Sequence, residues 1–454
     1  MKKNCLLLIS FFASVLTVYA TTINHVEIIE DSSFAAQLRY SNTYYVIKDV
    51  IDLEGASVII PKDCVLKMEG GQLKNGIIIG NNTYIEAAPY SIFSSNLNLK
   101  GTFIASEAYP EWFESTDDAV KIRKSLEIFD NVKLTAKHYI LQSVDENGYG
   151  IVVPSGRILH GNRRANNTLN NDQIIEIKGD ISYKAVVALS SSTILTDLTI
   201  QGQRKNNTSC VATLGGFQSR LTIERVGTSG AHYGFNLQTY LTNINQCVAN
   251  YNDVGFYIHG EYSGNDISIE GTTISLSTCF AVDSKITGYE MVGLAYSTMS
   301  NCAADGCGAP VSGNLSNNVD IGYAYSFTQC KNLTINSCGV ENGLAAVKTQ
   351  TCKNIIFNAP SFLINKRTDV KVSNEFVMRP VVNIRYSSFI VFNYMFLHSD
   401  GMSKYYTDNT PLMLLYGSAQ SSPSVIMKNG YEGIKESNIG TEGFLTKEKN
   451  LIIE

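Results

Sequence analysis

Residues 221–260 read LTIERVGTSGAHYGFNLQTYLTNINQCVANYNDVGFYIHG and contain one pattern twice. The apolar triplet Leu221–Ile223 is followed about 23 residues later by Asn243–Asn245, the spacing of a short structural repeat. A second series, Phe235–Leu237 and then Phe256–Ile258, keeps step with the first. Strands this short cannot bury a face alone, so the pattern predicts a solenoid of stacked coils with at least two sheets.

The repeat extends in both directions from this stretch. We expect further coil strands in the segments that share its pattern: Val186–Leu189, Leu198–Ile200, Val211–Leu214, Ile267–Ile269, Leu333–Ile335 and Ile355–Phe357. They carry the solenoid to about residue 365, with ~23 residues per coil. Apolar triplets separated by Gly or Asn turns between Asp52 and Phe103 predict a similar N-terminal segment.

Breaks in the rhythm suggest four parts. Residues 1–20 have the basic start, apolar stretch and small residues of a secretory signal, which predicts a periplasmic or secreted protein that begins near Thr21. We expect an N-terminal β-coil segment over 21–113, a central solenoid over 114–379 and a C-terminal β-rich cap over 380–454. The helical spacing of apolar residues over 117–129 predicts one short helix after the only Trp, Trp112.

Charge and composition exclude some partners. The chain has a formal net charge of −5, and loss of Lys2 and Lys3 with the signal would leave −7. Nucleic-acid binding proteins normally have a basic surface, so we expect no nucleic acid partner. No later apolar run reaches the ~20 residues of a membrane span, so we expect no membrane span. We also expect the protein to be a monomer.

Ten cysteines in an exported chain would normally suggest disulfides. Five of them instead recur at coil-like spacing: Cys247, Cys279, Cys302, Cys330 and Cys352. Free Cys packs as a small apolar residue, so we expect stacked thiols, with Cys302 and Cys307 as the one pair close enough for a local disulfide. No CxxC motif supports a zinc site.

The segment from Pro110 to Phe113, the paired Asp117–Asp118 and the stretch Ile151–Gly161 together resemble the pectate-lyase-like superfamily of right-handed parallel β-helices. This superfamily includes secreted polysaccharide lyases and tailspike-like depolymerases. The resemblance covers roughly residues 50–365. The family's Gly-Asp-Gly run is absent, and Glu114–Thr116 stands in its place. The resemblance implies the fold class, an all-β right-handed parallel β-helix, and an action on polysaccharide, whereas a shared fold alone does not assign a reaction.

Two reactions suit such a helix. A lyase needs a Tyr, His or Lys base beside a group that neutralises the uronate carboxylate. We take His232, Tyr233, His259 and Lys285, which stand next to predicted strands in successive coils, as its candidate catalytic residues. Arg204, in a long turn, and Tyr289 are the candidate substrate-binding residues, because Arg suits oxyanion contact.

A hydrolase needs two carboxyl groups. Glu341, which follows a predicted strand, is its candidate acid, with Asp320 or Asp305 as a partner. Calcium assists some lyases but needs clustered oxygen ligands. Asp253, Asp266 and Asp283 could converge only across coils, so no metal ligand is assigned and calcium stays an open possibility.

Three functions therefore remain open. The first is a lyase that cleaves a uronate-containing polysaccharide, with a glycosaminoglycan such as chondroitin sulfate as the favoured substrate. The second is a glycoside hydrolase that uses Glu341. The third is a non-catalytic solenoid for glycan binding or adhesion. The geometry of the site must decide between them.

Overall fold

The computed structural model describes residues 24–29, 33–136, 138–162, 173–205, 207–264, 266–308, 322–364, 380–398, 413–417, 425–432, 439–443 and 451–453. The predicted signal, residues 1–20, lies outside them. The chain divides into two compact units, and the division falls between Ala105 and Ser115, close to the boundary predicted at Trp112. No helix in the described ranges is long and apolar enough to cross a bilayer.

The first unit is built mainly of short parallel strands. Strands β1, β2, β5, β7 and β4 form one ladder with β8 beside β7, and β3 pairs with β6. Their bounds, with the one short helix α2, are β1 (Asn24–Ile28), α2 (Phe34–Gln37), β2 (Thr43–Ile47), β3 (Val50–Asp52), β4 (Ser57–Ile59), β5 (Val65–Met68), β6 (Gln72–Lys74), β7 (Gly76–Ala87) and β8 (Leu97–Ile104). The apolar triplets predicted here as strands form these ladders.

A short 3-10 turn, η1 (Pro110–Trp112), and helix α3 (Asp118–Ile128) follow. Asp117 caps α3, since its carboxylate accepts a hydrogen bond from the Ala119 N–H. The inner face of the helix buries Ala119, Ile122 and Leu126. The helix predicted over 117–129 is therefore confirmed.

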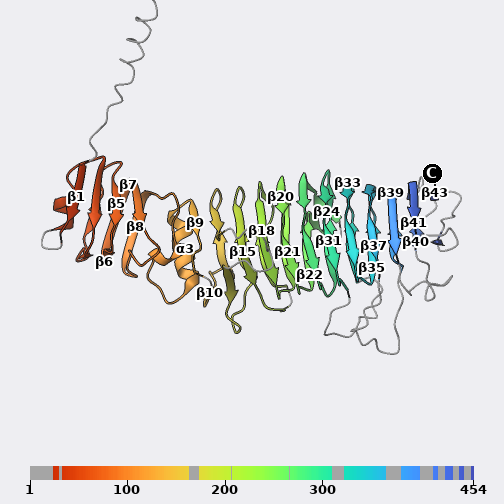
Figure 1. The fold of residues 1–454 in the computed structure, drawn as a ribbon, viewed down its shortest axis with the longest axis horizontal. Helices are drawn as coiled ribbons and strands as arrows, with labels where there is room; N and C mark the ends of the chain where they lie inside the picture. The colour runs from red at the N-terminus through yellow and green to blue at the C-terminus, as the bar shows by residue number, and fades with distance from the viewer. Residues whose placement is uncertain are drawn as a thin grey trace, which may run out of the picture. The chain divides into compact units, whose positions relative to one another are not determined.

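The second unit is a right-handed parallel β-helix, as predicted, and its strands follow one another in chain order (Figure 1). We call its larger sheet the bent sheet; it has 21 strands in the described ranges. These are β9 (Asn131–Lys133), β10 (His138–Leu141), β12 (Ile158–His160), β13 (Ile174–Ile177), β15 (Ile194–Gln201), β18 (Thr222–Ser229), β20 (Thr242–Asn245), β21 (Val248–Asn250), β25 (Gly271–Thr272), β26 (Ile274–Ser277), β27 (Phe280–Val282), β29 (Leu294–Ala295), β30 (Thr298–Ser300), β31 (Ala303–Asp305), β33 (Lys331–Asn336), β34 (Gly339–Glu341), β36 (Lys353–Asn358), β37 (Ser361–Leu363), β39 (Ser388–His398), β41 (Val425–Glu432) and β43 (Leu451–Ile453).

The other sheet, which we call the straight sheet, has 12 strands in the same described ranges. These are β11 (Tyr149–Val153), β14 (Ala185–Leu189), β16 (Ser209–Thr213), β17 (Gln218–Ser219), β19 (Tyr233–Tyr240), β22 (Val254–His259), β28 (Thr287–Val292), β32 (Tyr323–Thr328), β35 (Ala345–Gln350), β38 (Val382–Arg385), β40 (Met413–Gly417) and β42 (Ile439–Gly443). Its register Val187–Val211–Phe235–Phe256 confirms the second predicted series.

Three corners turn the chain within each coil. The first leads from the bent sheet into a straight-sheet strand, the second leads out of it, and the third divides the bent sheet. Single left-handed residues make the third corner in successive coils, among them Gln246, Thr278, Asn301 and Ser337. Each costs about 1 kcal/mol in an L-residue. Their N–H groups still donate to the next coil, for example from Thr278 to the Ser300 carbonyl, so the sharp turn breaks no ladder.

Stacked side chains fill the space between the sheets. The rings of Phe235, Phe256, Tyr289 and Tyr325 form a column with centroids 4.8, 4.9 and 5.1 Å apart. The thiols of Cys247, Cys279, Cys302 and Cys338 follow the third corner, and each donates to the carbonyl two residues before it. All nine cysteines in the described ranges are free and buried. Stacked thiols are confirmed for Cys247, Cys279 and Cys302, whereas Cys330 and Cys352, predicted in the same series, follow the left-handed residues Gln329 and Thr351 at the second corner. The disulfide considered for Cys302 and Cys307 is absent.

Two predictions about the coils were wrong. Ile223 pairs with Leu195, whereas Leu198 pairs with Val226, because each coil carries two apolar triplets and the spacing matched the wrong one. Ile267–Ile269 belongs to an antiparallel hairpin outside the ladders. In the predicted cap region, the described strands from β38 to β43 pair with both parallel ladders.

Candidate active site

The first corner holds a histidine against a carboxylate. His232 precedes β19 and Asp253 precedes β22 in the next coil, and the Val254 N–H donates to the His232 carbonyl. The His232 Nδ1 lies 2.9 Å from Asp253 Oδ2, and the two side chains are 19% and 15% exposed. A carboxylate that accepts the Nδ1 proton fixes the tautomer, which leaves the Nε2 lone pair free to accept a proton.

A chain of rings extends from His232 across the outer face of the straight sheet. His232 meets Tyr233 edge-on at 4.3 Å, and Tyr233 stacks on Tyr257 at 5.1 Å. Tyr257 in turn stacks on His259 at 4.4 Å. The structure therefore brings His232, Tyr233 and His259, which the sequence placed at opposite ends of neighbouring strands, into one continuous row.

Glu290 lies beside this row, in register with Tyr257 on the next strand, β28. Burial raises the pKa of its carboxyl above the ordinary value, against the opposing effect of Lys348 and His232. Burial also raises the pKa of Tyr233 and of Tyr257, and the negative charge of Glu290 adds to both shifts. One carboxyl therefore acts on the surrounding rings, and burial disfavours its charged form.

The pKa of His259 shifts in the opposite direction. Burial lowers the pKa of its imidazole, so the ring favours the neutral form. Its Nδ1 lies 2.7 Å from the Gly260 carbonyl, to which the neutral ring donates its single N–H, and its Nε2 lies 3.1 Å from the side-chain amide of Asn236. The Gly260 hydrogen bond and the stacking on Tyr257 hold His259 in place, which suits a positioning role.

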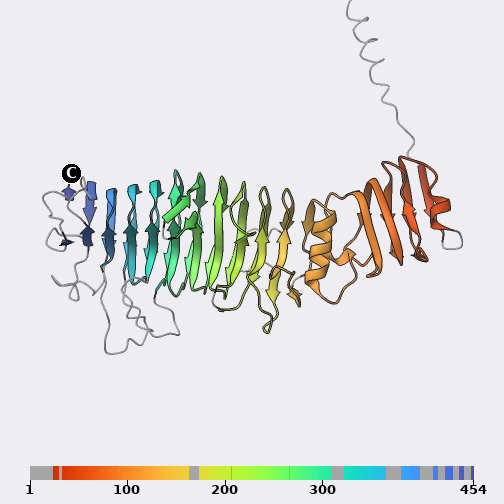
Figure 2. The ribbon, with the colours of Figure 1, turned by 180° about the vertical axis from the view of Figure 1, so that it is seen from behind.

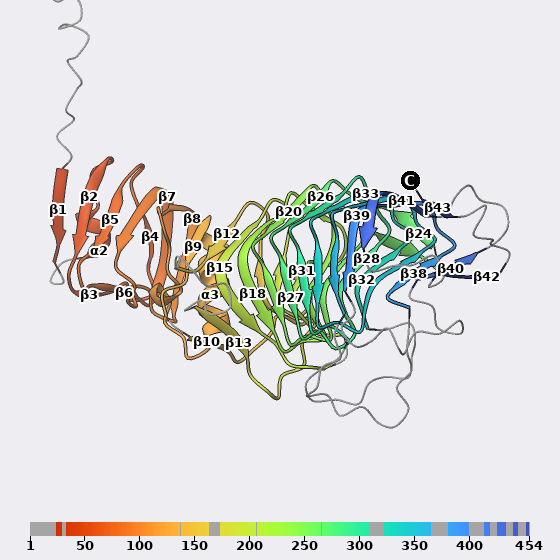
Figure 3. The ribbon, with the colours of Figure 1, turned by 45° about the vertical axis from the view of Figure 1, so that its right-hand side comes forward.

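An antiparallel hairpin, β23 (Glu261–Ser263) and β24 (Asp266–Ile269), follows His259 and crosses the neighbouring strands (Figure 2). Its strand β24 lies against the end of β28, since Ile267 faces Gly293, and Figure 3 shows the hairpin from another side. The hairpin carries Tyr262, whose ring centroid lies 6.5 Å from that of His259 and whose hydroxyl helps to raise the pKa of Tyr257.

Glycine lets the hairpin approach. A Cβ on Gly293, which has a φ of +62°, would lie 2.6 Å from the Cδ1 and Cγ1 atoms of Ile267. We call the assembled group the outer-face cluster; it consists of His232, Asp253, Tyr233, Tyr257, His259, Tyr262 and Glu290.

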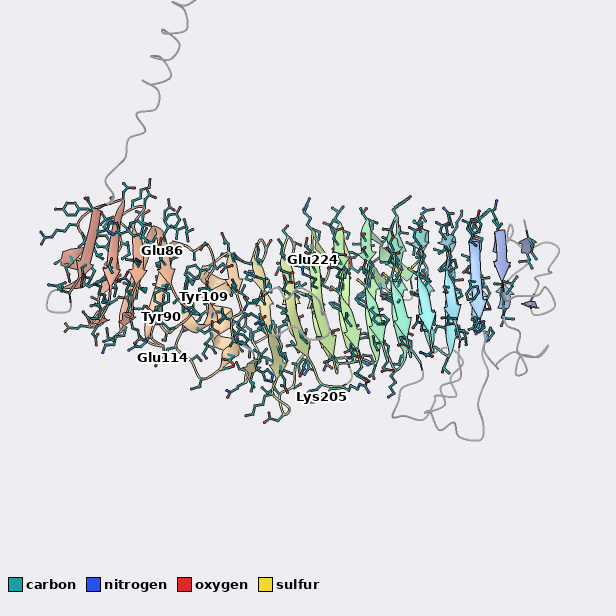
Figure 4. All side chains as sticks on the ribbon, viewed as in Figure 1. Glu86, Tyr90, Tyr109, Glu114, Lys205 and Glu224 are labelled. Atoms are coloured by element: carbon teal, nitrogen blue, oxygen red, sulfur yellow. The ribbon has the colours of Figure 1, made fainter. Side chains whose placement is uncertain are left out.

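Two further predicted residues lie near the first corner. Lys285 is exposed there, and its N–H donates to the Asn252 carbonyl. The Arg204 guanidinium donates two hydrogen bonds, of 3.0 and 2.6 Å, to the Tyr251 carbonyl. Arg204 therefore joins turns of different coils. Its neighbour Lys205 lies at the edge of the second unit opposite Glu224 (Figure 4).

Tyr289, which was predicted to bind substrate, faces the core and not the outer surface of its strand. It is fully buried, and its hydroxyl donates to the carbonyls of Cys279 and Ala303, so it cannot contact a substrate. Side chains alternate across a strand, and the outward position belongs to the next residue, Glu290. The predicted substrate-binding role of Tyr289 is therefore corrected to a core role.

Glu341 lies outside the outer-face cluster. It ends β34 in the bent sheet, is exposed, and stands in register with Asp305 on β31. Asp305 Oδ1 accepts a hydrogen bond from Asn342 at 3.0 Å. The alternative partner, Asp320, lies outside the described residues.

The three aspartates considered as calcium ligands belong to three different features of the structure. Asp253 pairs with His232, Asp266 belongs to the hairpin, and Asp283 is buried at the first corner. Within the part of the chain that the structure describes, no group of three His, Cys, Asp or Glu residues is arranged to hold a metal ion.

Sequence reasoning missed Tyr257, Tyr262, Glu290, Lys348 and the pairing role of Asp253. A signal for two of them was present. Phe235, Phe256 and Tyr289 are aligned core aromatics, so the residues after them, Asn236, Tyr257 and Glu290, face outward in adjacent strands. Tyr262 had no such signal, because its hairpin looks like a coil strand in sequence.

The chain matches no protein-family model and no curated protein. Among solved structures, it is similar to the gp42 tailspike of Acinetobacter phage vb_AbaP_AS12, with 12% identity and a TM-score of 0.52. That alignment covers 76% of this chain and 61% of the tailspike, so the chain spans less than two thirds of its length.

Two weaker likenesses accompany it. The A-module of the Azotobacter vinelandii mannuronan C-5 epimerase AlgE4 is 14% identical over 75% of this chain and 94% of the module, with a TM-score of 0.39. Tailspike protein 2 of the Escherichia coli O157:H7 bacteriophage CAB120 is 12% identical over 76% of this chain and 47% of its own, with a TM-score of 0.43. At such identities the likeness concerns the fold alone.

Proposed function

We propose that the protein is an enzyme that cleaves a uronate-containing polysaccharide by β-elimination at the outer-face cluster. The observation that carries the proposal is the grouping of a half-buried carboxyl, Glu290, whose pKa is raised, with three tyrosines and a carboxylate-oriented histidine. A protonated carboxyl donates a hydrogen bond to a substrate carboxylate, and Lys348, which acts electrostatically on Glu290, adds a positive charge.

The remaining residues supply the proton transfers. In β-elimination a base removes the proton beside the uronate carboxylate, a carbon–carbon double bond forms, and the bond to the glycosidic oxygen breaks. We assign the base to His232 Nε2, since Asp253 holds its other nitrogen. Burial keeps Tyr233 protonated, so its hydroxyl suits protonation of the leaving oxygen. Tyr262, which is 43% exposed, offers a ring face against which a sugar ring packs, whereas Tyr257 is stacked between Tyr233 and His259.

The experiment offers the protein a panel of acidic polysaccharides and follows the ultraviolet absorbance of an unsaturated uronate. The panel contains alginate, pectate and chondroitin sulfate, the last being the substrate we favour from the sequence. We expect absorbance with at least one polymer and its loss in Glu290→Gln. Glu341→Gln serves as the matched control, because it removes an exposed carboxylate outside the cluster. Reducing ends released without that absorbance would refute β-elimination.

A second candidate is a glycoside hydrolase that uses Glu341 and Asp305. Their register on adjacent strands favours it, since strands lie about 4.8 Å apart and retaining hydrolases hold their carboxyl groups about 5–5.5 Å apart. Loss of reducing-end release in both Glu341→Gln and Asp305→Asn, with Glu290→Gln fully active, would establish it. Polysaccharide bound without any cleavage would instead favour the non-catalytic solenoid.

A further inference from the structure

A second surface of the β-helix carries aromatic and basic side chains away from the outer-face cluster. It lies at the second corner, in four consecutive coils that the register Ala295–Lys331–Lys353–Ser388 aligns. The residues directly after these positions form a column that begins and ends with an aromatic ring: Tyr296, Asn332, Asn354 and Phe389. We call this column together with Lys331 and Lys353 the second-corner strip.

The backbone of the column favours asparagine over aromatic residues. All four positions are left-handed, with φ values of 49, 53, 57 and 56° in chain order. Asn enters this region readily and bulky side chains do not. The two asparagines also bond each other, Asn354 Nδ2 to Asn332 Oδ1 at 2.8 Å. Tyr296 and Phe389 are 65% and 37% exposed, so burial does not explain the rings there.

The strip is also basic between its aromatic ends. Lys331 and Lys353 stand side by side in register, an arrangement that destabilises a sheet through like-charge repulsion. Lys331 Nζ lies 2.6 Å from Glu270, whereas Lys353 is exposed and no described hydrogen bond or ion pair engages its ammonium. Glu270 neutralises Lys331, so the strip carries one uncompensated positive charge, at Lys353, in a chain with a net charge of −5.

We propose that the second-corner strip binds an acidic polysaccharide chain that runs along the helix axis. Coils stack at about 4.8 Å, which is close to the length of one extended pyranose residue, so the two rings stand about 14 Å apart. The rings pack on sugar faces, the asparagine amides meet hydroxyl groups, and Lys353 pairs with carboxylate or sulfate groups. This binding does not depend on catalysis at the outer-face cluster.

The column itself supplies replacements that suit the backbone. The double variant Tyr296→Asn, Phe389→Asn extends the existing asparagine ladder, and Lys353→Ser copies Ser388 at the aligned position. The matched control is Tyr394→Asn at the third corner, where φ is 53° and the side chain is 64% exposed. All variants are made in the Glu290→Gln protein, so that cleavage does not consume the polymer.

The measurement is electrophoretic retardation of the full chain in gels that contain alginate, chondroitin sulfate or neutral dextran. We expect retardation by an acidic polymer and not by dextran, about tenfold weaker binding in the double variant and in Lys353→Ser, and no change in Tyr394→Asn. Equal retardation of the double variant and the control, equal retardation by dextran, or none by either acidic polymer would overturn the proposal. Failure of the proposed lyase activity would leave these expectations intact, because they concern binding alone.

Discussion

His232 Nδ1 and Asp253 Oδ2 lie 2.9 Å apart although their residues belong to successive coils. The contact exists because the turns before β19 and β22 stack in register: the Asp253 N–H donates to the Ala231 carbonyl. The β-helix thus orients a histidine through a carboxylate one coil away, and the proposed chemistry depends on that stacking.

We expect His232→Ala and Asp253→Asn each to lower kcat by about 10²–10⁴-fold, since a positioned base contributes about that much and an amide would turn the wrong tautomer toward the substrate. The control is His138→Ala, which breaks another histidine–carboxylate pair, His138 Nε2 to Glu176 at 2.9 Å. Steady-state kinetics with unfolding scans would check this. Full activity in a folded Asp253→Asn protein would remove the pair from the mechanism.

Glu290 should give activity and stability a shared pH dependence. Its folded-state pKa is raised above the unfolded value. The stability that Glu290 contributes is therefore fully present below the unfolded pKa and is lost as pH rises through the folded pKa. Activity that needs the protonated carboxyl falls over the same window. Glu290→Gln should flatten the unfolding profile over the pH range between the unfolded and folded pKa values of this carboxyl. Lys348→Met should move both alkaline limbs to higher pH; a shift to lower pH would contradict the assignment.

Gly293→Ala should raise KM more than it lowers kcat, because the new Cβ meets Ile267 and displaces the hairpin that carries Tyr262. The left-handed conformation itself is tolerable, since Gln329 and Thr351 adopt it at the same corner in later coils. Ile267→Ala in the same protein should therefore restore KM. Kinetics of the single and double variants test this, and a KM that stays raised in the double variant would place the fault in the backbone.

Thiol reagents should not modify the folded protein at its nine described cysteines, which are all buried and free, and should modify them after denaturation without a reductant. Mass spectrometry of labelled peptides would count the modified residues in each state. Any of these cysteines that resists labelling until reduced would reveal a disulfide and contradict the stacked-thiol core.

The fold was largely predictable because coil strands alternate and end at recognisable turns. The register Phe235–Phe256 and the helix that Asp117 caps were predicted from such local patterns. The misplaced triplet at Leu198 shows the limit: a coil with two similar apolar triplets leaves their pairing ambiguous until the chain is folded. The hairpin at Ile267 shows another, since parallel and antiparallel strands look alike in sequence.

The candidate site was only half predictable. His232, Tyr233 and His259 were found because they stand beside strands. Glu290 was missed because its neighbour, Tyr289, was chosen as the substrate-binding residue although it faces the core. The raised pKa of Glu290 comes from burial, and Lys348, two strands further along, opposes the rise; no local window contains either cause.

The corners also bear on how such a protein changes over time. Added chain between Gly260 and Gly271 leaves the ladders on either side in register, as the β23–β24 hairpin shows. New segments can therefore be gained or lost between coils while the stacked interior stays the same. Selection can then alter what the surface recognises one coil at a time, because the residues that determine folding differ from those that determine recognition.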